Sequence, residues 1–136
     1  MIDIHIKTIP QPEQRYQTLG DYVKTLESNK DGNRIFESIL VSDVGNSDME
    51  FLTAIHELIE WYLTERRGIN EEDITKFDIE HPELEEPGDD PRAPYHKEHM
   101  FASSIEKLLC KELGISDDQY TDFWKDIYGK LFPNNS

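Results

Sequence analysis

The sequence predicts an α+β fold that is mostly helical, with about four helices and a small antiparallel sheet formed by the N-terminal strands. Two patterns carry this prediction. Apolar and polar residues alternate strictly near the N-terminus, which is typical of a half-buried strand, and apolar residues recur at helical spacing from residue 48 onward. The chain has 136 residues, enough for one hydrophobic core, so we expect a single domain over residues 1–136.

The first strand is expected over residues 2–7, with three isoleucines on one face and His5 on the solvent face. A second strand is expected over residues 34–42, where apolar side chains occupy both faces. The Asp-Gly pair and the flanking amides within residues 29–33 predict a turn before it. Residues 16–28 partly suit a short helix but contain a glycine, so their structure stays open at this point.

The first long helix has clear boundaries in the sequence. Ser47 followed three residues later by Glu50 is a capping-box pattern, and Gly68 is typical of a left-handed C-terminal cap, which together place the helix near residues 48–67. The later elements are expected to be a short helix from Asn70 to before Pro82, a loop over residues 86–94, a long helix from between Pro91 and Pro94 to Leu113, and a final helix from Ser116.

The second long helix is expected to bury an apolar stripe and to begin under two acidic caps. Asp89 and Asp90 precede this helix and would cap its N-terminus. The stripe follows helical spacing and consists of Phe101, Ala102, Ile105, Leu108 and Leu109.

Three ionisable residues stand inside the hydrophobic first long helix. His56 and Glu60 are four residues apart, so they project about 40° apart on one face and both can reach one metal ion. Glu57 lies about 100° from His56. This stretch resembles the zincin helix His-Glu-x-x-His, with Glu60 in place of the second histidine. The alternative interpretation of His56 is a histidine that is hydrogen-bonded at the edge of a core.

The second long helix carries a similar pair. His99 and Glu106 share a face about 100° to 120° from the centre of the apolar stripe, whereas His96 points closer to solvent. Glu98 falls within the stripe itself, so it is either a charge in the first turn or an inward-facing ligand.

Two helices that pack by their apolar stripes would bring these polar rims together. Mixed imidazole and carboxylate ligation suits Zn(II) first, with Mn(II) or Fe(II) as alternatives. If three protein ligands bind the ion, a position remains for water, and Glu57 would accept a proton from it in metal-assisted hydrolysis. The predicted metal ligands are His56, Glu60, His99 and Glu106, with an acid from residues 86–90 as the alternative to Glu106.

The chain is strongly acidic, with 29 acidic and 14 basic residues and a net charge of −15. This balance argues against direct nucleic-acid binding, because proteins that bind nucleic acid neutralise phosphates with basic side chains. Ten acids and one lysine fall within residues 71–90, a segment that attracts cations. We therefore expect a small molecule or a protein as the partner. Two other hypotheses stay open: a non-catalytic acidic interaction protein that imitates DNA, and a structural protein with a buried polar network.

The sequence contains no apolar run of about 18 residues and no pattern typical of a signal peptide, so we expect a cytoplasmic protein that does not enter the membrane. Cys110 is the single cysteine, which excludes an internal disulfide. Its apolar neighbours predict a packed thiol rather than a nucleophile.

Several strings stand out along the chain: Arg15-Tyr16, Leu19-Gly20-Asp21-Tyr22, Ala54-Ile55-His56-Glu57-Leu58-Ile59-Glu60, Arg67-Gly68-Ile69, Phe77-Asp78, Glu86-Pro87-Gly88-Asp89-Asp90-Pro91-Arg92-Ala93-Pro94-Tyr95 and Glu98-His99. Together they resemble a group of small uncharacterised proteins from phages and bacteria. The resemblance covers most of the chain. It implies a shared fold and a shared site around these strings, and it implies no reaction.

Overall fold

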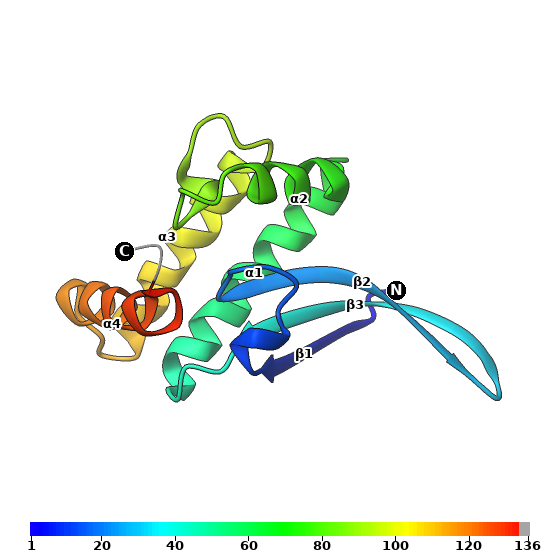
Figure 1. Cartoon of the computed structure of the whole chain (residues 1–136), viewed down its shortest axis with the longest axis horizontal. Coiled ribbons are helices and arrows are strands. Elements are labelled where there is room, and N and C mark those ends of the chain that lie inside the picture. Colours follow the sequence, from blue (N-terminus) through cyan, green and yellow to red (C-terminus); the bar gives the residue numbers. More distant parts are fainter. Residues whose placement is uncertain (134–136) are drawn as a thin grey trace. The chain divides into compact units, whose positions relative to one another are not determined.

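The computed structural model describes residues 1–133, and residues 134–136, which belong to the tail expected to fray, lie outside the described part. Within residues 1–133 the chain forms four α-helices, two short 3₁₀ turns and a three-stranded sheet, which confirms the mostly helical α+β prediction (Figure 1). The chain divides into two units, Met1–Leu58 and Ile59–Ser136, and the division falls inside helix α1 (Ser47–Arg66). The single-domain expectation stays a prediction.

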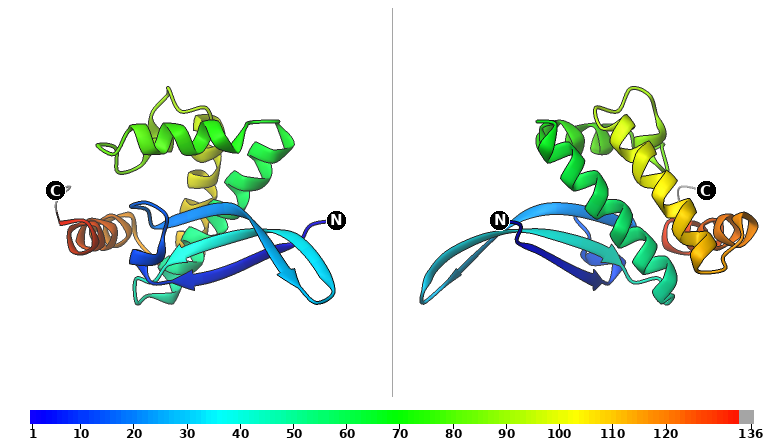
Figure 2. Two further views of the ribbon diagram at one scale, coloured as in Figure 1. Left: turned by 45° about the vertical axis from the view of Figure 1, so that its right-hand side comes forward. Right: turned by 180° about the vertical axis from the view of Figure 1, so that it is seen from behind.

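The first unit is built on a sheet in the order β1-β3-β2, with β1 at Ile4–Ile9, β2 at Gly20–Asn29 and β3 at Gly32–Ser42. A short 3₁₀ turn, η1 (Gln11–Glu13), lies between β1 and β2. The predicted turn joins β2 to β3 as a hairpin, whose far end extends beyond β1 (Figure 2). The segment whose structure the sequence left open is therefore largely strand β2.

The expectation of a purely antiparallel sheet is wrong, because β1 pairs with β3 in parallel while β2 pairs with β3 antiparallel. Strand β3 takes the central place since it has apolar side chains to bury on both faces: Ile39 and Val41 on one, Phe36 on the other. The chain runs up β1, down β2 and up β3. Placing β3 beside β1 therefore aligns two strands of the same direction.

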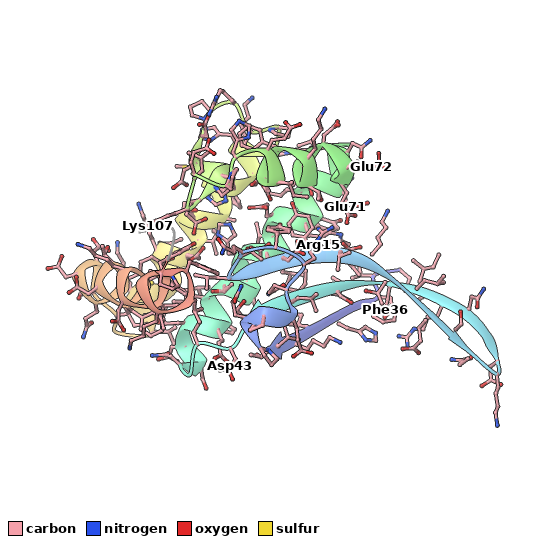
Figure 3. The ribbon with its side chains drawn as sticks, in the orientation of Figure 1. Arg15, Phe36, Asp43, Glu71, Glu72 and Lys107 are labelled. Atoms are coloured by element: carbon pink, nitrogen blue, oxygen red, sulfur yellow. The ribbon has the colours of Figure 1, made fainter. Side chains whose placement is uncertain are left out.

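His5 on β1 belongs to a surface stack and not to a cluster of ligands. Its ring lies 3.9 Å, centroid to centroid, from the ring of Phe36, whose side chain on β3 is labelled in Figure 3. Asp3 and Arg34 lie within hydrogen-bonding distance of its Nε2 atom, at 3.2 and 3.0 Å. The predicted faces of this strand are therefore wrong in part, because Ile2 and Ile6 are 61% and 51% exposed, whereas His5 stacks on the buried Phe36 ring.

Helix α1 begins and ends close to the predicted residues, although its N-terminal cap lies one residue earlier than expected. The Asn46 side chain accepts a hydrogen bond from the Met49 N–H at 3.1 Å, in the place expected for Ser47. The Glu50 carboxylate reaches back to the Val44 N–H at 3.0 Å. At the other end Gly68 adopts a φ of 68°, which confirms the left-handed C-terminal cap.

The second unit contains the last part of α1 and three further helices: α2 (Glu71–Glu80), α3 (His96–Glu112) and α4 (Asp117–Leu131). Asn70 caps α2, and Ser116 with Gln119 forms a capping box for α4, as predicted. The predicted acidic caps of α3 are wrong: its N-terminus has no side-chain cap, because Asp89 and Asp90 bind other groups. Among the described residues, no helix has the length and apolar character needed to cross a bilayer.

Helix α3 buries a different face from the one predicted. Phe101 and Leu108 were expected in the core, yet they are 52% and 58% exposed. Only Ala102 of the predicted stripe is buried. The buried residues of α3 are Glu98, His99, Ala102, Glu106 and Cys110. The helix therefore turns its ionisable side chains inward, which the hydrophobic pattern alone could not indicate.

Candidate metal centre

Helix α1 places His56 and Glu60 one turn apart on the same face, and both are nearly excluded from solvent, with 7% and 4% exposure. Leu52, one turn before His56, is fully buried on the same face of the helix. A carboxylate at such a position is costly to bury unless charged or polar groups compensate it. The partner of Glu60 comes from α3.

His99 on α3 lies between two carboxylates. Its Nδ1 atom is 3.0 Å from Oε2 of Glu60, and its Nε2 atom is 2.9 Å from Oδ1 of Asp89. An ionised carboxylate accepts hydrogen bonds and cannot donate them, so both contacts are made only when each ring nitrogen carries a proton. The two carboxylates therefore stabilise either an imidazolium or a cation that replaces one of its protons.

His56, Glu60 and His99 each offer one ligand atom, and these atoms all lie within 4.8 Å of one another. All three side chains are buried. Two imidazoles and one carboxylate are a ligand set found in catalytic zinc sites and in non-haem iron(II) sites, so the donor chemistry fits a divalent transition-metal ion. Among the described residues, this buried group could hold a metal ion. Glu106, the fourth predicted ligand, is not part of it.

The loop at η2 (Pro87–Asp89) supports His99 from the side of its ring. A Cβ atom added to Gly88 would lie 2.3 Å from Cγ and 2.4 Å from Nδ1 of His99, so only glycine allows the loop backbone to approach the ring this closely. His96 contributes to the same arrangement, because its Nδ1 atom lies 2.8 Å from the Gly88 carbonyl oxygen. His96 thus holds the loop.

Two hydrogen bonds connect the N-terminal part of α3 to other residues of the second unit. Glu98 accepts from Nη1 of Arg67 at 2.5 Å, so the carboxylate inside the apolar stripe is an ion-pair partner. The Tyr95 hydroxyl donates to Asp78 at 2.5 Å, which gives Asp78 a structural contact. These contacts hold the start of α3, and with it His99, in place.

Glu106 is engaged with α4. It accepts a hydrogen bond from the Tyr120 hydroxyl at 2.5 Å. Burial and the neighbouring Glu106 carboxylate raise the pKa of Tyr120 far above its ordinary value of 10.0. The Tyr128 hydroxyl donates to Glu86 at 3.1 Å, and burial followed by that carboxylate raises its pKa as well. A ligand role for Glu106 stays a prediction.

Glu57, the predicted catalytic base, lies half-buried beside strand β2. Its Cγ and Oε1 atoms would each be 2.8 Å from a Cβ atom added to Gly20. Gly20 therefore makes room for Glu57 within the first unit. The proposed proton-accepting role of Glu57 stays a prediction.

Two neighbouring acids of the 86–90 loop, Asp89 and Asp90, bind different partners. Hydrogen bonds from Arg92 lower the pKa of the Asp90 carboxyl to about 2. The adjacent Asp89 binds His99. Two neighbouring acids therefore have distinct partners, and this division could not be read from the sequence, where both suited helix caps. Cys110 is buried, as predicted, and burial raises the pKa of its thiol.

The fold and the site define an α+β chain with a buried histidine and glutamate group carried by helices α1 and α3. Compared with known family models, curated proteins and solved structures, the chain matches none. Sequence reasoning had found the three residues of this group. The sequence had also indicated an acid from residues 86–90 near this group, but neither its identity as Asp89 nor the role of Gly88.

Proposed function

We propose that this protein binds a divalent metal ion, zinc in the first instance, through His56, Glu60 and His99. One observation carries the proposal: two imidazoles and a carboxylate, all buried, offer ligand atoms within 4.8 Å of one another. A buried glutamate beside a histidine is costly in an apolar environment, and a bound cation would offset that cost. Mn(II) and Fe(II) are the alternatives that the same donor set accepts.

The reaction that fits this set best is metal-assisted hydrolysis. A divalent ion held by three protein ligands supplies Lewis-acid activation of water near neutral pH. Glu57 would accept the proton of that water, as the zincin-like string on α1 suggests. The net charge of −15 favours a small molecule or a protein as the partner over nucleic acid. A cytoplasmic location is part of the same proposal.

Metal content is the first test. Untagged protein purified without chelator should contain about one zinc ion per chain by elemental analysis, as three protein ligands to one ion require. His56→Ala and His99→Ala should each abolish the bound zinc. His5→Ala is the matched control, because His5 stacks on Phe36 and is not one of the three ligands, and it should retain the metal.

The competing interpretation is a metal-free polar network, and heat denaturation separates the two. A chelator should lower the Tm of the wild-type protein, because an ion that binds only the folded state stabilises it by mass action. The proposal would be refuted if the wild-type protein stays metal-free after incubation with zinc and its Tm does not change when chelator is added.

Catalysis needs its own test. Zinc-loaded protein should hydrolyse p-nitrophenyl acetate faster than His99→Ala does. Glu57→Gln should lose this activity while its zinc content remains that of the wild type. Loss of zinc in Glu57→Gln would instead make Glu57 a structural or ligand residue. Equal hydrolysis rates in the zinc-loaded wild type and in His99→Ala would restrict the function to metal binding.

A further inference from the structure

We infer that Asp89 is a positioning residue that holds the Nε2–H of His99 and thereby assigns Nδ1 as the nitrogen that binds the ion. This inference rests on the metal-binding function proposed above. It adds a residue outside the ligand group and states which of the two His99 nitrogens coordinates. Both statements follow from contacts inside the second unit.

The two ring nitrogens of His99 face different environments. Nδ1 faces Glu60, whose side chain is 6% exposed and which belongs to the ligand group. Nε2 faces Asp89, whose side chain is 59% exposed. The inner nitrogen thus lies beside another ligand, whereas the outer nitrogen points to the solvent side. An ion held with Glu60 and His56 is reached from Nδ1.

A histidine that binds a metal through one nitrogen normally donates the N–H of the other to a carboxylate or carbonyl, which fixes the ring orientation. Asp89 occupies that place, with its Oδ1 atom 2.9 Å from Nε2. Glu86 is the other acid on this side, but its Oε2 atom is 4.0 Å from Nε2, beyond hydrogen-bonding distance. Asp89 is therefore the group that holds this proton.

The loop backbone keeps Asp89 in register with His99. Gly88 lies against the ring so closely that an added Cβ would overlap Cγ and Nδ1, and its carbonyl oxygen is bound by His96. The Tyr128 hydroxyl donates to the Glu85 carbonyl oxygen at 3.3 Å at the start of the same loop. The ring is thus fixed by a backbone contact on its side and by a carboxylate at its outer nitrogen.

Asp89 and Asp90 form a matched pair for the test, since both are acids of the same loop and only Asp89 touches His99. Asp89→Ala should weaken zinc binding about 10- to 100-fold in a competition titration of the full-length protein, the usual effect of losing such a hydrogen bond. Asp89→Asn should keep most of the affinity, because its amide oxygen can still accept from Nε2–H. Asp90→Ala removes the same charge and should bind zinc as the wild type does.

Cadmium-loaded protein with isotope-labelled histidine gives a readout that a general loss of stability would not move. Nitrogen NMR should show coupling to cadmium at Nδ1 of His99 and a proton on Nε2, with the His99→Gln spectrum assigning the signals. Coupling at Nε2, or equal zinc affinity in Asp89→Ala and the wild type, would overturn the inference while metal binding stands. Absence of any metal binding in the wild type would overturn both the proposed metal-binding function and this inference.

Discussion

Helices α1 and α3 both contribute to the candidate metal centre, yet their buried faces differ in how many large apolar side chains they contain. On α1 the fully buried Leu52 shares its face with His56 and Glu60, so apolar and polar side chains are buried there together. On α3 the buried face holds Glu98, His99 and Glu106, while Phe101 and Leu108 face outward. We infer from this difference that polar contacts contribute more to the orientation of α3 than the predicted apolar stripe does.

Each buried glutamate or histidine of α3 has a contact that compensates its burial. Glu98 pairs with Arg67, and Glu106 accepts from Tyr120. His99 is set between Glu60 and Asp89. Buried charges are tolerated when they are paired and hydrogen-bonded, and removing one member of a pair is more costly than the pair is stabilising. The rotation of α3 thus depends on several polar contacts at once.

The largest contrast is expected between two identical substitutions. Leu52→Ala should lower the free energy of unfolding by about 3–5 kcal/mol, because it opens a cavity in a fully buried position. Leu108→Ala should change it by less than about 1 kcal/mol, since that side chain is 58% exposed. Urea denaturation followed by circular dichroism measures both. Equal losses of unfolding free energy in Leu52→Ala and Leu108→Ala would mean that α3 buries the predicted apolar stripe.

The two helices also show which features of the fold could be predicted from the sequence and which could not. Capping residues and helical spacing are local signals, so α1, α2 and α4 were predicted close to their bounds, and His56, Glu60 and His99 were found from the residue types on two helices. The face of α3 was predicted wrongly because hydrophobic spacing assigns no gain to paired charges. The parallel pairing of β1 depends on a distant part of the chain. The contact of Asp89 with His99 depends on how the 86–90 loop folds against α3, which the residue pattern does not contain.

The ion pair at the start of α3 should have the next largest effect. Arg67→Ala leaves the buried Glu98 carboxylate without its guanidinium and should cost about 2 kcal/mol, less than a fully buried pair because the Arg67 side chain is half exposed. The neighbouring Arg66→Ala removes the same charge from an exposed position and should stay within about 0.5 kcal/mol of the wild type. If both variants lose the same stability, overall charge and not the Glu98 contact explains the effect.

The smallest effect at neutral pH, and the clearest in alkali, is expected at Tyr120. Tyr120→Phe removes the hydrogen bond to Glu106, which should cost about 1–2 kcal/mol near pH 7. Burial and Glu106 raise the pKa of this phenol in the folded state, so folding favours the neutral form. The stabilisation is complete below the unfolded pKa of 10.0 and is lost as the pH rises above it.

Above that pH the unfolded chain releases the Tyr120 proton while the folded chain keeps it, so the wild-type free energy of unfolding falls with pH. In Tyr120→Phe this fall should be shallower by about 1.4 kcal/mol per pH unit, the value for one proton. Denaturation curves at several alkaline pH values measure the slope, and Tyr62→Phe tests whether losing any tyrosine has the same result. If the pH dependence of the free energy of unfolding is the same in Tyr120→Phe as in the wild type, Tyr120 ionises in the folded protein, and its contact with Glu106 on α3 does not raise its pKa.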